Sequence, residues 1–170
     1  MAVYVMPNLH GRHDRYTAMF EMIKFNKSDT LYIHGDSIDG DEKHGAEPIK
    51  LISDMMKDPN IINLKGNHEL WALPLIHPLK KINFSDCEIL GYRKYPFKKS
   101  YMRLGDWLGF GGMTTLEGLV NISHKEVEKI IDYIDSWGFY TDITVGENLP
   151  LISEEKWTFS IDLDYNAHCC

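Results

Sequence analysis

Apolar and polar positions in the first third of the chain follow two alternating periods. Short apolar runs of β-forming residues occupy 3–6, 30–33 and 61–64, and each run predicts a strand. Between them, residues 14–25 and 47–57 repeat apolar side chains at spacings of three and four, which predicts helices with one buried face. Alternating strands and helices with short connections predict a parallel sheet with right-handed crossovers.

The second half of the chain carries fewer clear patterns. Ser123 and Glu126 form a capping box ahead of a buried apolar stripe, so a helix is expected over 123–137. Residues 139–145 and 157–163 have the composition of later strands. Since no repeat or linker interrupts the 170 residues, we expect a single α/β domain spanning the whole chain.

The charge balance limits the partners that the chain can bind. A formal net charge of −7 argues against a broad electrostatic grip on a nucleic acid, but it permits a phosphorylated small molecule or a phosphoprotein at a site that holds a cation. The basic and aromatic segment 92–103 has two readings, as a surface for a nucleic acid or phosphorylated partner or, more commonly for such segments, as a solvated loop edge.

Cysteine usage and hydropathy indicate where in the cell the protein is expected. No apolar run approaches the length of a membrane span, so no membrane association is expected. The three cysteines are Cys87 and the terminal pair Cys169 and Cys170, an odd count that favours reduced thiols and a cytoplasmic location. The adjacent pair is interpreted as a frayed thiol tail, with metal binding or redox chemistry as the alternatives.

Each of the first three predicted strands runs directly into a short polar cluster, at 8–11, 35–40 and 66–69. If the strands are parallel and adjacent, the three clusters meet at one edge of the sheet, where ligand sites of such sheets form. Histidine, carboxylate and amide oxygen are ligands for divalent ions such as Mn, Fe and Zn. Singly, each cluster is better explained by a surface turn or a surface histidine than by a site; the shared placement at three strand ends is what indicates a site.

The three clusters read NLHG, GDSIDG and GNHE, and together they resemble the signature of calcineurin-like metallophosphoesterases, in particular the bacterial phosphoprotein-phosphatase-like branch. The resemblance covers residues 1–75 and continues faintly through GFGGMTTLEGL at 109–119. It implies an α/β fold, the calcineurin-like metallophosphoesterase sheet with helices on its faces, with the second half shortened.

The resemblance implies a centre for one or two divalent ions (Mn, Fe, Zn or Mg). In it, Asp36 bridges the ions, His10 completes one coordination shell and Asn67 gives an amide oxygen to the other. Asn8 replaces the family's first aspartate, so it should coordinate weakly. The family's two late histidine motifs are missing, which leaves His168 as the one late candidate ligand; its position also suits an incidental residue of a closing strand.

The resemblance also implies the catalytic roles. His68 would act as the general acid, with Asp39 orienting it and keeping it charged, while a metal-activated hydroxide attacks phosphorus. The alternative for this pair is a structural ion pair that holds two loops together. Gly40 stands where the family has a phosphate-binding arginine, and Arg12 or Arg15 is the candidate replacement.

Three hypotheses about function remain open from the sequence. The leading one is a metal-dependent phosphoesterase acting on phosphomonoesters or phosphoproteins, with activity reduced by the departures at Asn8 and Gly40. The second is a catalytically inactive phosphatase-like module that binds a phosphorylated partner. The third is a shortened copy of the family with exposed sheet edges, which self-associates to stay in solution.

Overall fold

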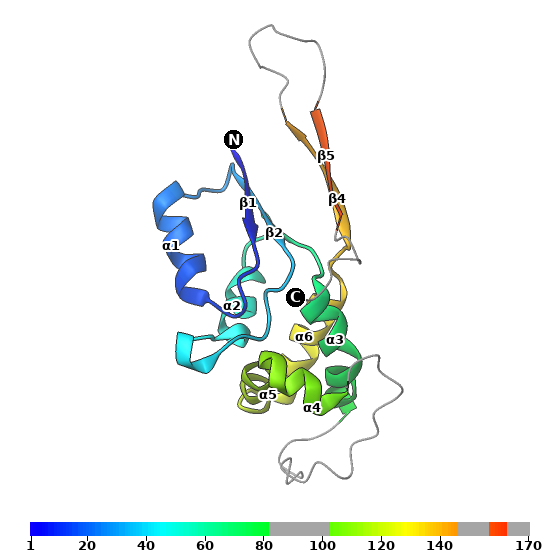
Figure 1. The fold of residues 1–170 in the computed structure, drawn as a ribbon. Helices are drawn as coiled ribbons and strands as arrows, with labels where there is room; N and C mark the ends of the chain where they lie inside the picture. Colours follow the sequence, from blue (N-terminus) through cyan, green and yellow to red (C-terminus); the bar gives the residue numbers. More distant parts are fainter. Residues whose placement is uncertain (82–102, 146–156, 163–170) are drawn as a thin grey trace, which may run out of the picture.

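The first three strands form one parallel sheet in the order β1-β2-β3 (Figure 1). The computed structural model describes residues 1–81, 103–145 and 157–162. Strand β1 (Val3–Pro7) pairs with β2 (Thr30–His34), and β2 pairs with β3 (Ile61–Asn63), both in parallel. The three predicted strands and their adjacency are therefore confirmed, as is the α/β fold class.

Helices connect the strands where the apolar periodicity placed them. Helix α1 (His13–Ile23) joins β1 to β2, and α2 (Pro48–Met55) lies between β2 and β3. The later helix α6 (His124–Asp135) is also confirmed. The remaining helical segments are η1 (Glu42–His44), α3 (Asn67–Ile76), η2 (His77–Lys81), α4 (Leu104–Trp107), the π-type turn η4 (Leu108–Gly112) and α5 (Met113–Val120).

Helix α6 begins with the capping box that the sequence indicates. The backbone N–H of Ser123 donates to Glu126 Oε2 at 3.0 Å, and the Ser123 hydroxyl accepts from the Glu126 N–H. The stripe buried by this helix consists of Val127, Ile130, Ile131 and Ile134. This stripe belongs to the same hydrophobic core as α2 and the sheet, so α6 closes the core from the far end of the chain.

The sheet buries one of its faces. Leu31 and Ile33 of β2 are fully buried, as part of the core shared with the helices. Their alternating neighbours face the other way, and on β1 the exposed fractions of Val3 and Val5 are 40% and 48%. This two-residue period is the expected signature of a sheet packed on one side.

Strands β4 (Tyr140–Val145) and β5 (Trp157–Asp162) form a separate antiparallel pair, which extends away from the helices (Figure 1). The pair is attached to the parallel sheet just before β4, where the Lys65 N–H donates to the Gly138 carbonyl at 2.8 Å. Among the described residues, no helix is long and apolar enough to cross a membrane. Residues 82–102, Cys87, His168, Cys169 and Cys170 lie outside the described part, so the expectations made for them stay predictions.

Candidate active site

The loops that follow β1, β2 and β3 lie against one another. The backbone N–H of His10 donates to the Asp36 carbonyl at 2.8 Å, and the N–H of Gly11 donates to the Ser37 carbonyl at 2.9 Å. These bonds join the first loop to the second. The structure therefore brings His10, Asp36 and Asn67 to the same end of the parallel sheet, as their strand-end positions indicate.

A buried carboxylate joins the second loop to the third. Glu69 of α3 is fully buried and accepts four backbone N–H groups, from Asp36 at 2.9 Å, Ser37 at 2.8 Å, Ile38 at 3.2 Å and Gly66 at 2.7 Å. Burial raises the pKa of Glu69 to about 7, while the N–H groups around it favour its charged form. Glu69 is the last residue of the GNHE motif, and its role in joining the loops is not evident from the sequence.

Backbone strain gathers at these loops. His10, Asp36 and Asp39 all have positive φ angles, of 44°, 48° and 63°. Non-glycine residues adopt this left-handed region at a cost of about 1 kcal/mol or more, so such residues persist where the surrounding structure holds them. The only other described non-glycine residue with positive φ is Lys24, which ends α1. His10, Asp36 and Asp39 all lie in the loops at this sheet edge, and such strain is common where ligands bind.

Two glycines allow the second and third loops to approach closely. A Cβ atom on Gly66 would overlap the Asp36 carboxylate, and a Cβ on Gly35 would lie 2.7 Å from the Gly66 Cα. Gly35 also has a φ of 69°. Because a side chain at either position would separate the loops, these glycines set the distance between Asp36 and the start of α3.

The Asp36 carboxylate is surrounded by amide groups. Its Oδ2 accepts from Asn8 Nδ2 at 3.1 Å, and its Oδ1 accepts from the backbone N–H of His68 at 3.0 Å. The side-chain amide of Asn67 lies 3.1 Å from both carboxylate oxygens. With its NH₂ group turned toward them, this amide donates to both oxygens.

These residues fit a divalent ion in kind, but they offer it little negative charge. Within the described ranges, no group of three or more His, Cys, Asp or Glu side chains could hold a metal ion. An ion would therefore depend on the amide oxygens of Asn67 and Asn8 beside Asp36 and His10. Burial and the neighbouring His68 lower the pKa of His10, which favours the neutral imidazole that a metal requires.

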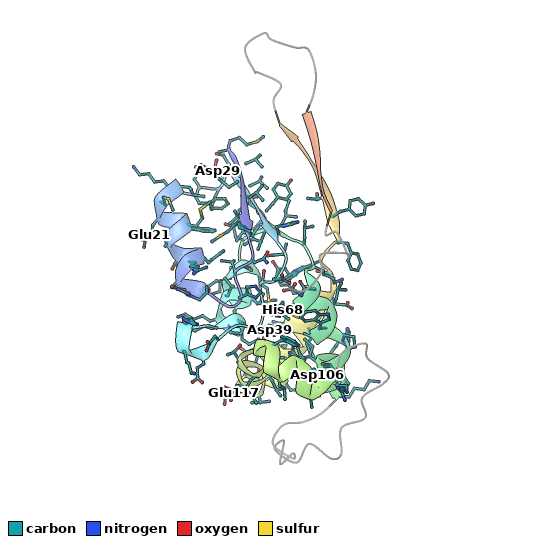
Figure 2. All side chains as sticks on the ribbon, viewed as in Figure 1. Glu21, Asp29, Asp39, His68, Asp106 and Glu117 are labelled. Carbon is teal, nitrogen blue, oxygen red and sulfur yellow. The ribbon has the colours of Figure 1, made fainter. Side chains whose placement is uncertain are left out.

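His68 and Asp39 form a close pair at the same edge (Figure 2). The Nδ1 atom of His68 lies 2.8 Å from Asp39 Oδ2, and Asp39 is fully buried. Asp39 also accepts from Trp107 Nε1 at 2.8 Å and from the Thr115 hydroxyl at 2.7 Å. Burial lowers the pKa of His68, but the hydrogen bond and charge of Asp39 outweigh that effect and raise the pKa above its usual value.

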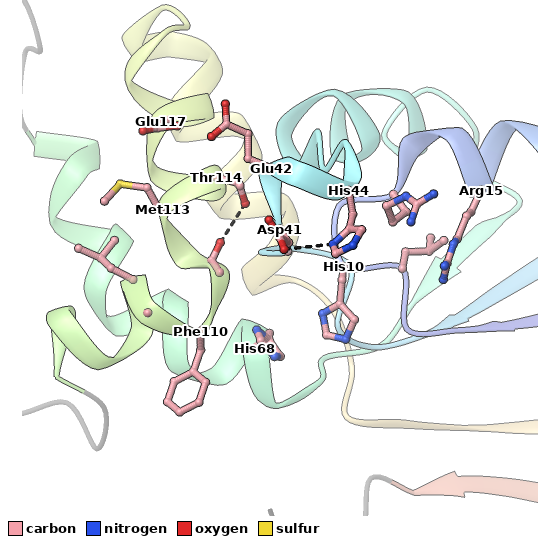
Figure 3. A pocket seen from close by; sticks show the side chains of 16 residues that line it. His10, Arg15, Asp41, Glu42, His44, His68, Phe110, Met113, Thr114 and Glu117 are labelled. Carbon is pink, nitrogen blue, oxygen red and sulfur yellow. Dashed lines mark hydrogen bonds and ion pairs between the residues drawn. The ribbon is translucent and has the colours of Figure 1, made fainter.

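Beside this pair lies an open cleft of about 830 Å³ (Figure 3). Both His10 and His68 line it, and their rings meet edge to face with centroids 4.8 Å apart. Arg12 also lines the cleft, but its guanidinium binds the Asp14 carboxylate through two bonds of 2.7 and 2.6 Å. Arg15 lines the cleft without an ion pair to any described residue. Of the two candidate phosphate-binding arginines, Arg15 is therefore the one less engaged.

The backbone around Gly40 leaves no room for the arginine that the family has at this position. A Cβ at Gly40 would overlap the carbonyl of His10, and its φ is 126°. From the other side, Gly111 (φ 100°) packs so closely that a Cβ on it would lie 2.6 Å from the Gly40 nitrogen. The turn η4 thus lies against the position from which the missing side chain would extend.

Comparison with known proteins agrees with this arrangement. The chain is 33% identical over 106 residues to the symmetrical bis(5'-nucleosyl)-tetraphosphatase of Wigglesworthia glossinidia brevipalpis, which covers 61% of this chain and 38% of that protein. It is 33% identical over 89 residues to the protein of the same name from Haemophilus ducreyi, covering 51% of this chain and 31% of that protein. The chain therefore matches about a third of the length of these relatives.

A family match extends over nearly the whole chain. The model of the calcineurin-like phosphoesterase family matches residues 1–162, which include the three strand-end loops and the segment that carries Trp107 and Thr115. With that match, the resemblance seen in the three motifs is confirmed. The chain belongs to the calcineurin-like phosphoesterase family.

Proposed function

We propose that the protein hydrolyses a phosphoester or phosphoanhydride bond in a phosphorylated small molecule, with a divalent ion bound near Asp36 and Asn67. The observation that supports this proposal most is the His68–Asp39 pair, whose 2.8 Å contact lies at the cleft and next to the Asp36 carboxylate. An ion pair that only holds two loops together does not require its histidine to line a cleft. The position of His68 therefore favours a catalytic role over the structural alternative.

His68 is the proton donor in the proposed reaction. Its Nδ1 donates to Asp39, so Nε2 is the ring nitrogen left for a substrate. A water oxygen bonds to phosphorus as the bond to the leaving group breaks, and the attacking water releases a proton to solvent. The leaving oxygen keeps the electron pair of that bond and takes the proton from His68 Nε2, and His68 regains a proton from solvent. A bound divalent ion supplies Lewis-acid activation of the phosphoryl group and of the attacking water.

The substrate class follows from the relatives and from the cleft. The names of the two relatives describe hydrolysis of bis(5'-nucleosyl) tetraphosphates, and we extend that substrate class, nucleoside polyphosphates, to this chain. Phe110 supports it, because this side chain is 60% exposed at the edge of the cleft and its ring lies 5.9 Å from that of Trp71. An exposed aromatic ring of this kind suits stacking with a nucleobase. A phosphoprotein, which the sequence analysis also considered, has no support in these relatives.

The proposal is tested by hydrolysis assays on the EDTA-treated protein with Mn²⁺ titrated in. The substrates are p-nitrophenyl phosphate, bis(p-nitrophenyl) phosphate and bis(5'-adenosyl) tetraphosphate. We expect metal-dependent turnover that falls by about 10²- to 10⁴-fold in His68→Asn. The matched control is His77→Asn, because His77 pairs with Asp135 at 3.3 Å and does not line the cleft. A folded protein that hydrolyses none of the substrates at any Mn²⁺ concentration would refute the proposal.

A phosphate-binding module without turnover is the second candidate. Asn8 favours it, because its amide donates to Asp36 where the family has a second carboxylate, and Gly40 favours it, because no arginine fits there. Calorimetric titration with inorganic phosphate and with adenosine tetraphosphate distinguishes the two. Binding without hydrolysis in the presence of Mn²⁺ would support the module, and hydrolysis would exclude it.

A further inference from the structure

Asp39 is held by two residues from a distant part of the chain. Its Oδ2 accepts from Trp107 Nε1 at 2.8 Å, and its Oδ1 accepts from the Thr115 hydroxyl at 2.7 Å. All three residues are fully buried. The remaining contact of Oδ2 is His68 Nδ1, also at 2.8 Å. The carboxylate therefore has three side-chain partners, and only His68 lines the cleft.

Thr115 binds Asp39 twice. In addition to its donation to Oδ1, its hydroxyl oxygen accepts the backbone N–H of Asp39 at 2.8 Å. One hydroxyl thus fixes both the carboxylate rotamer and the backbone of a residue whose φ is 63°. Packing alone does not explain a threonine at this position, because valine has nearly the same shape. Valine lacks the hydroxyl that makes both bonds to Asp39.

The turn η4 brings the two donors to the same carboxylate. Trp107 ends α4 and Thr115 lies in the first turn of α5, and between them Phe110 and Gly111 leave helical geometry. Gly112 allows the indole to lie flat on the turn, because a Cβ at this position would overlap the Trp107 ring. The segment is therefore built so that residues eight positions apart both point at Asp39.

We propose that Trp107 and Thr115 are positioning residues for proton donation by His68. This inference rests on the proposed function, in which His68 is the general acid. Burying a carboxylate is costly unless its oxygens are hydrogen-bonded, and the two neutral donors satisfy Asp39 while leaving its contact with His68 intact. They also fix the carboxylate that binds His68 Nδ1, which leaves Nε2 as the free nitrogen of a ring that lines the cleft.

The test separates positioning from simple core packing by varying the leaving group. The variants are Trp107→Phe, which keeps a buried ring but removes the N–H, and Thr115→Val, which keeps the shape but removes the hydroxyl. Turnover is measured on a series of aryl phosphates from p-nitrophenyl to phenyl phosphate. A good leaving group needs little protonation and a poor one needs much, so a general-acid defect grows along the series.

We expect kcat for phenyl phosphate to fall by about 10- to 100-fold in Thr115→Val, and kcat for p-nitrophenyl phosphate to fall far less. Thr115→Ser retains the hydroxyl and should restore the dependence on the leaving group seen in the wild type. Trp137→Phe is the matched control for Trp107→Phe, because Trp137 is also buried but its indole N–H has no partner within the described structure. In this control variant, the dependence of kcat on the leaving group should be the same as in the wild type.

A second measurement does not depend on turnover. The proton on His68 Nδ1 should give a downfield resonance in the NMR spectrum of the metal-free protein, assigned by its loss in His68→Asn. In Thr115→Val and Trp107→Phe, we expect this resonance to move upfield and exchange faster with solvent. It should stay unchanged in Trp137→Phe.

The outcomes distinguish this inference from the proposed function. If the folded wild type hydrolyses nothing, the proposed function fails, and a shifted resonance in the variants would still show that the two donors position His68. If the wild type is active and the variants lose turnover equally on all aryl phosphates, or keep the resonance unchanged, the positioning role is overturned. Variants that fail to fold are replaced by Thr115→Ser and Thr115→Ala, whose contrast isolates the hydroxyl.

Discussion

Replacing Asn8 by aspartate should destabilise the metal-free protein and strengthen its response to metal. Asn8 Nδ2 lies 3.1 Å from Asp36 Oδ2, so the substitution exchanges a hydrogen bond for two facing carboxylates. Two unit charges at this separation repel by about 1 kcal/mol in water and about 5 kcal/mol at an effective dielectric constant near 20. Since Asn8 is exposed and Asp36 is buried, we expect about 2 kcal/mol at neutral pH and low salt.

The pH dependence of that cost has a definite sign. Facing carboxylates raise the pKa of one member of the pair, so the folded variant holds a proton more tightly than the unfolded chain does. Its stability relative to the wild type should therefore recover as the pH falls through this raised value toward the ordinary aspartate pKa, and the deficit should be largest above it. A divalent ion should reverse the deficit, adding about 1.4 kcal/mol for each tenfold gain in affinity.

The assay is urea unfolding followed by tryptophan fluorescence, in EDTA and across a Mn²⁺ titration, at neutral and mildly acidic pH. The double variant Asn8→Asp with Asp36→Asn is the control, because it exchanges the two groups and restores a single carboxylate. It should regain most of the stability lost in EDTA. An Asn8→Asp protein as stable as the wild type in EDTA, or no more responsive to Mn²⁺, would refute the reasoning.

Three further predictions concern other residues of the same edge. Gly66→Ala should lower stability by about 1–3 kcal/mol in thermal unfolding, because the new Cβ overlaps the Asp36 carboxylate. Glu69→Gln should cost about 2–4 kcal/mol in urea unfolding and speed amide exchange at Asp36, because an NH₂ group then faces backbone donors. Phe110→Ala should raise KM for bis(5'-adenosyl) tetraphosphate about tenfold at unchanged kcat in steady-state assays.

Two of these predictions have a matched control, and the third has a stability threshold that would contradict it. Gly105→Ala places a Cβ in open space, so equal losses from the two alanines would contradict the steric argument. For Glu69→Gln, stability within about 0.5 kcal/mol of the wild type would mean that the four N–H bonds contribute little. For Phe110→Ala, glycerol phosphate is the comparison substrate, and an equal rise in KM for this non-aromatic molecule would exclude stacking.

The sequence predicted the elements whose patterns are local. The strands before each polar cluster and helices α1, α2 and α6 follow from apolar periodicity and from the capping box at Ser123. Helix α3 was not predicted, because it is apolar on most sides and contains Pro74, a residue that disfavours a helix interior. In the structure, α3 continues past Pro74 to Ile76 and is held at its start by Glu69.

The candidate site was predictable only in part. Its strand-end residues were found because parallel strands carry their following loops to one edge. The two donors to Asp39 were not predicted, because neither Trp107 nor Thr115 carries a local sequence signal for this contact. These residues are 68 and 76 positions from Asp39, and no periodicity within one sequence reports a contact over that distance.

The close backbone packing at Gly40 limits which side chains this position can accept. A side chain introduced there would overlap the His10 carbonyl and crowd the Ala46 Cβ, so one substitution cannot supply the guanidinium that the family carries at this position. To accommodate that group, the loop that carries His10 would have to move, and the backbone of His10 is hydrogen-bonded to that of Asp36. A substitution at position 40 is therefore coupled to the placement of His10, whereas Arg15 of helix α1 already lines the cleft without any such change.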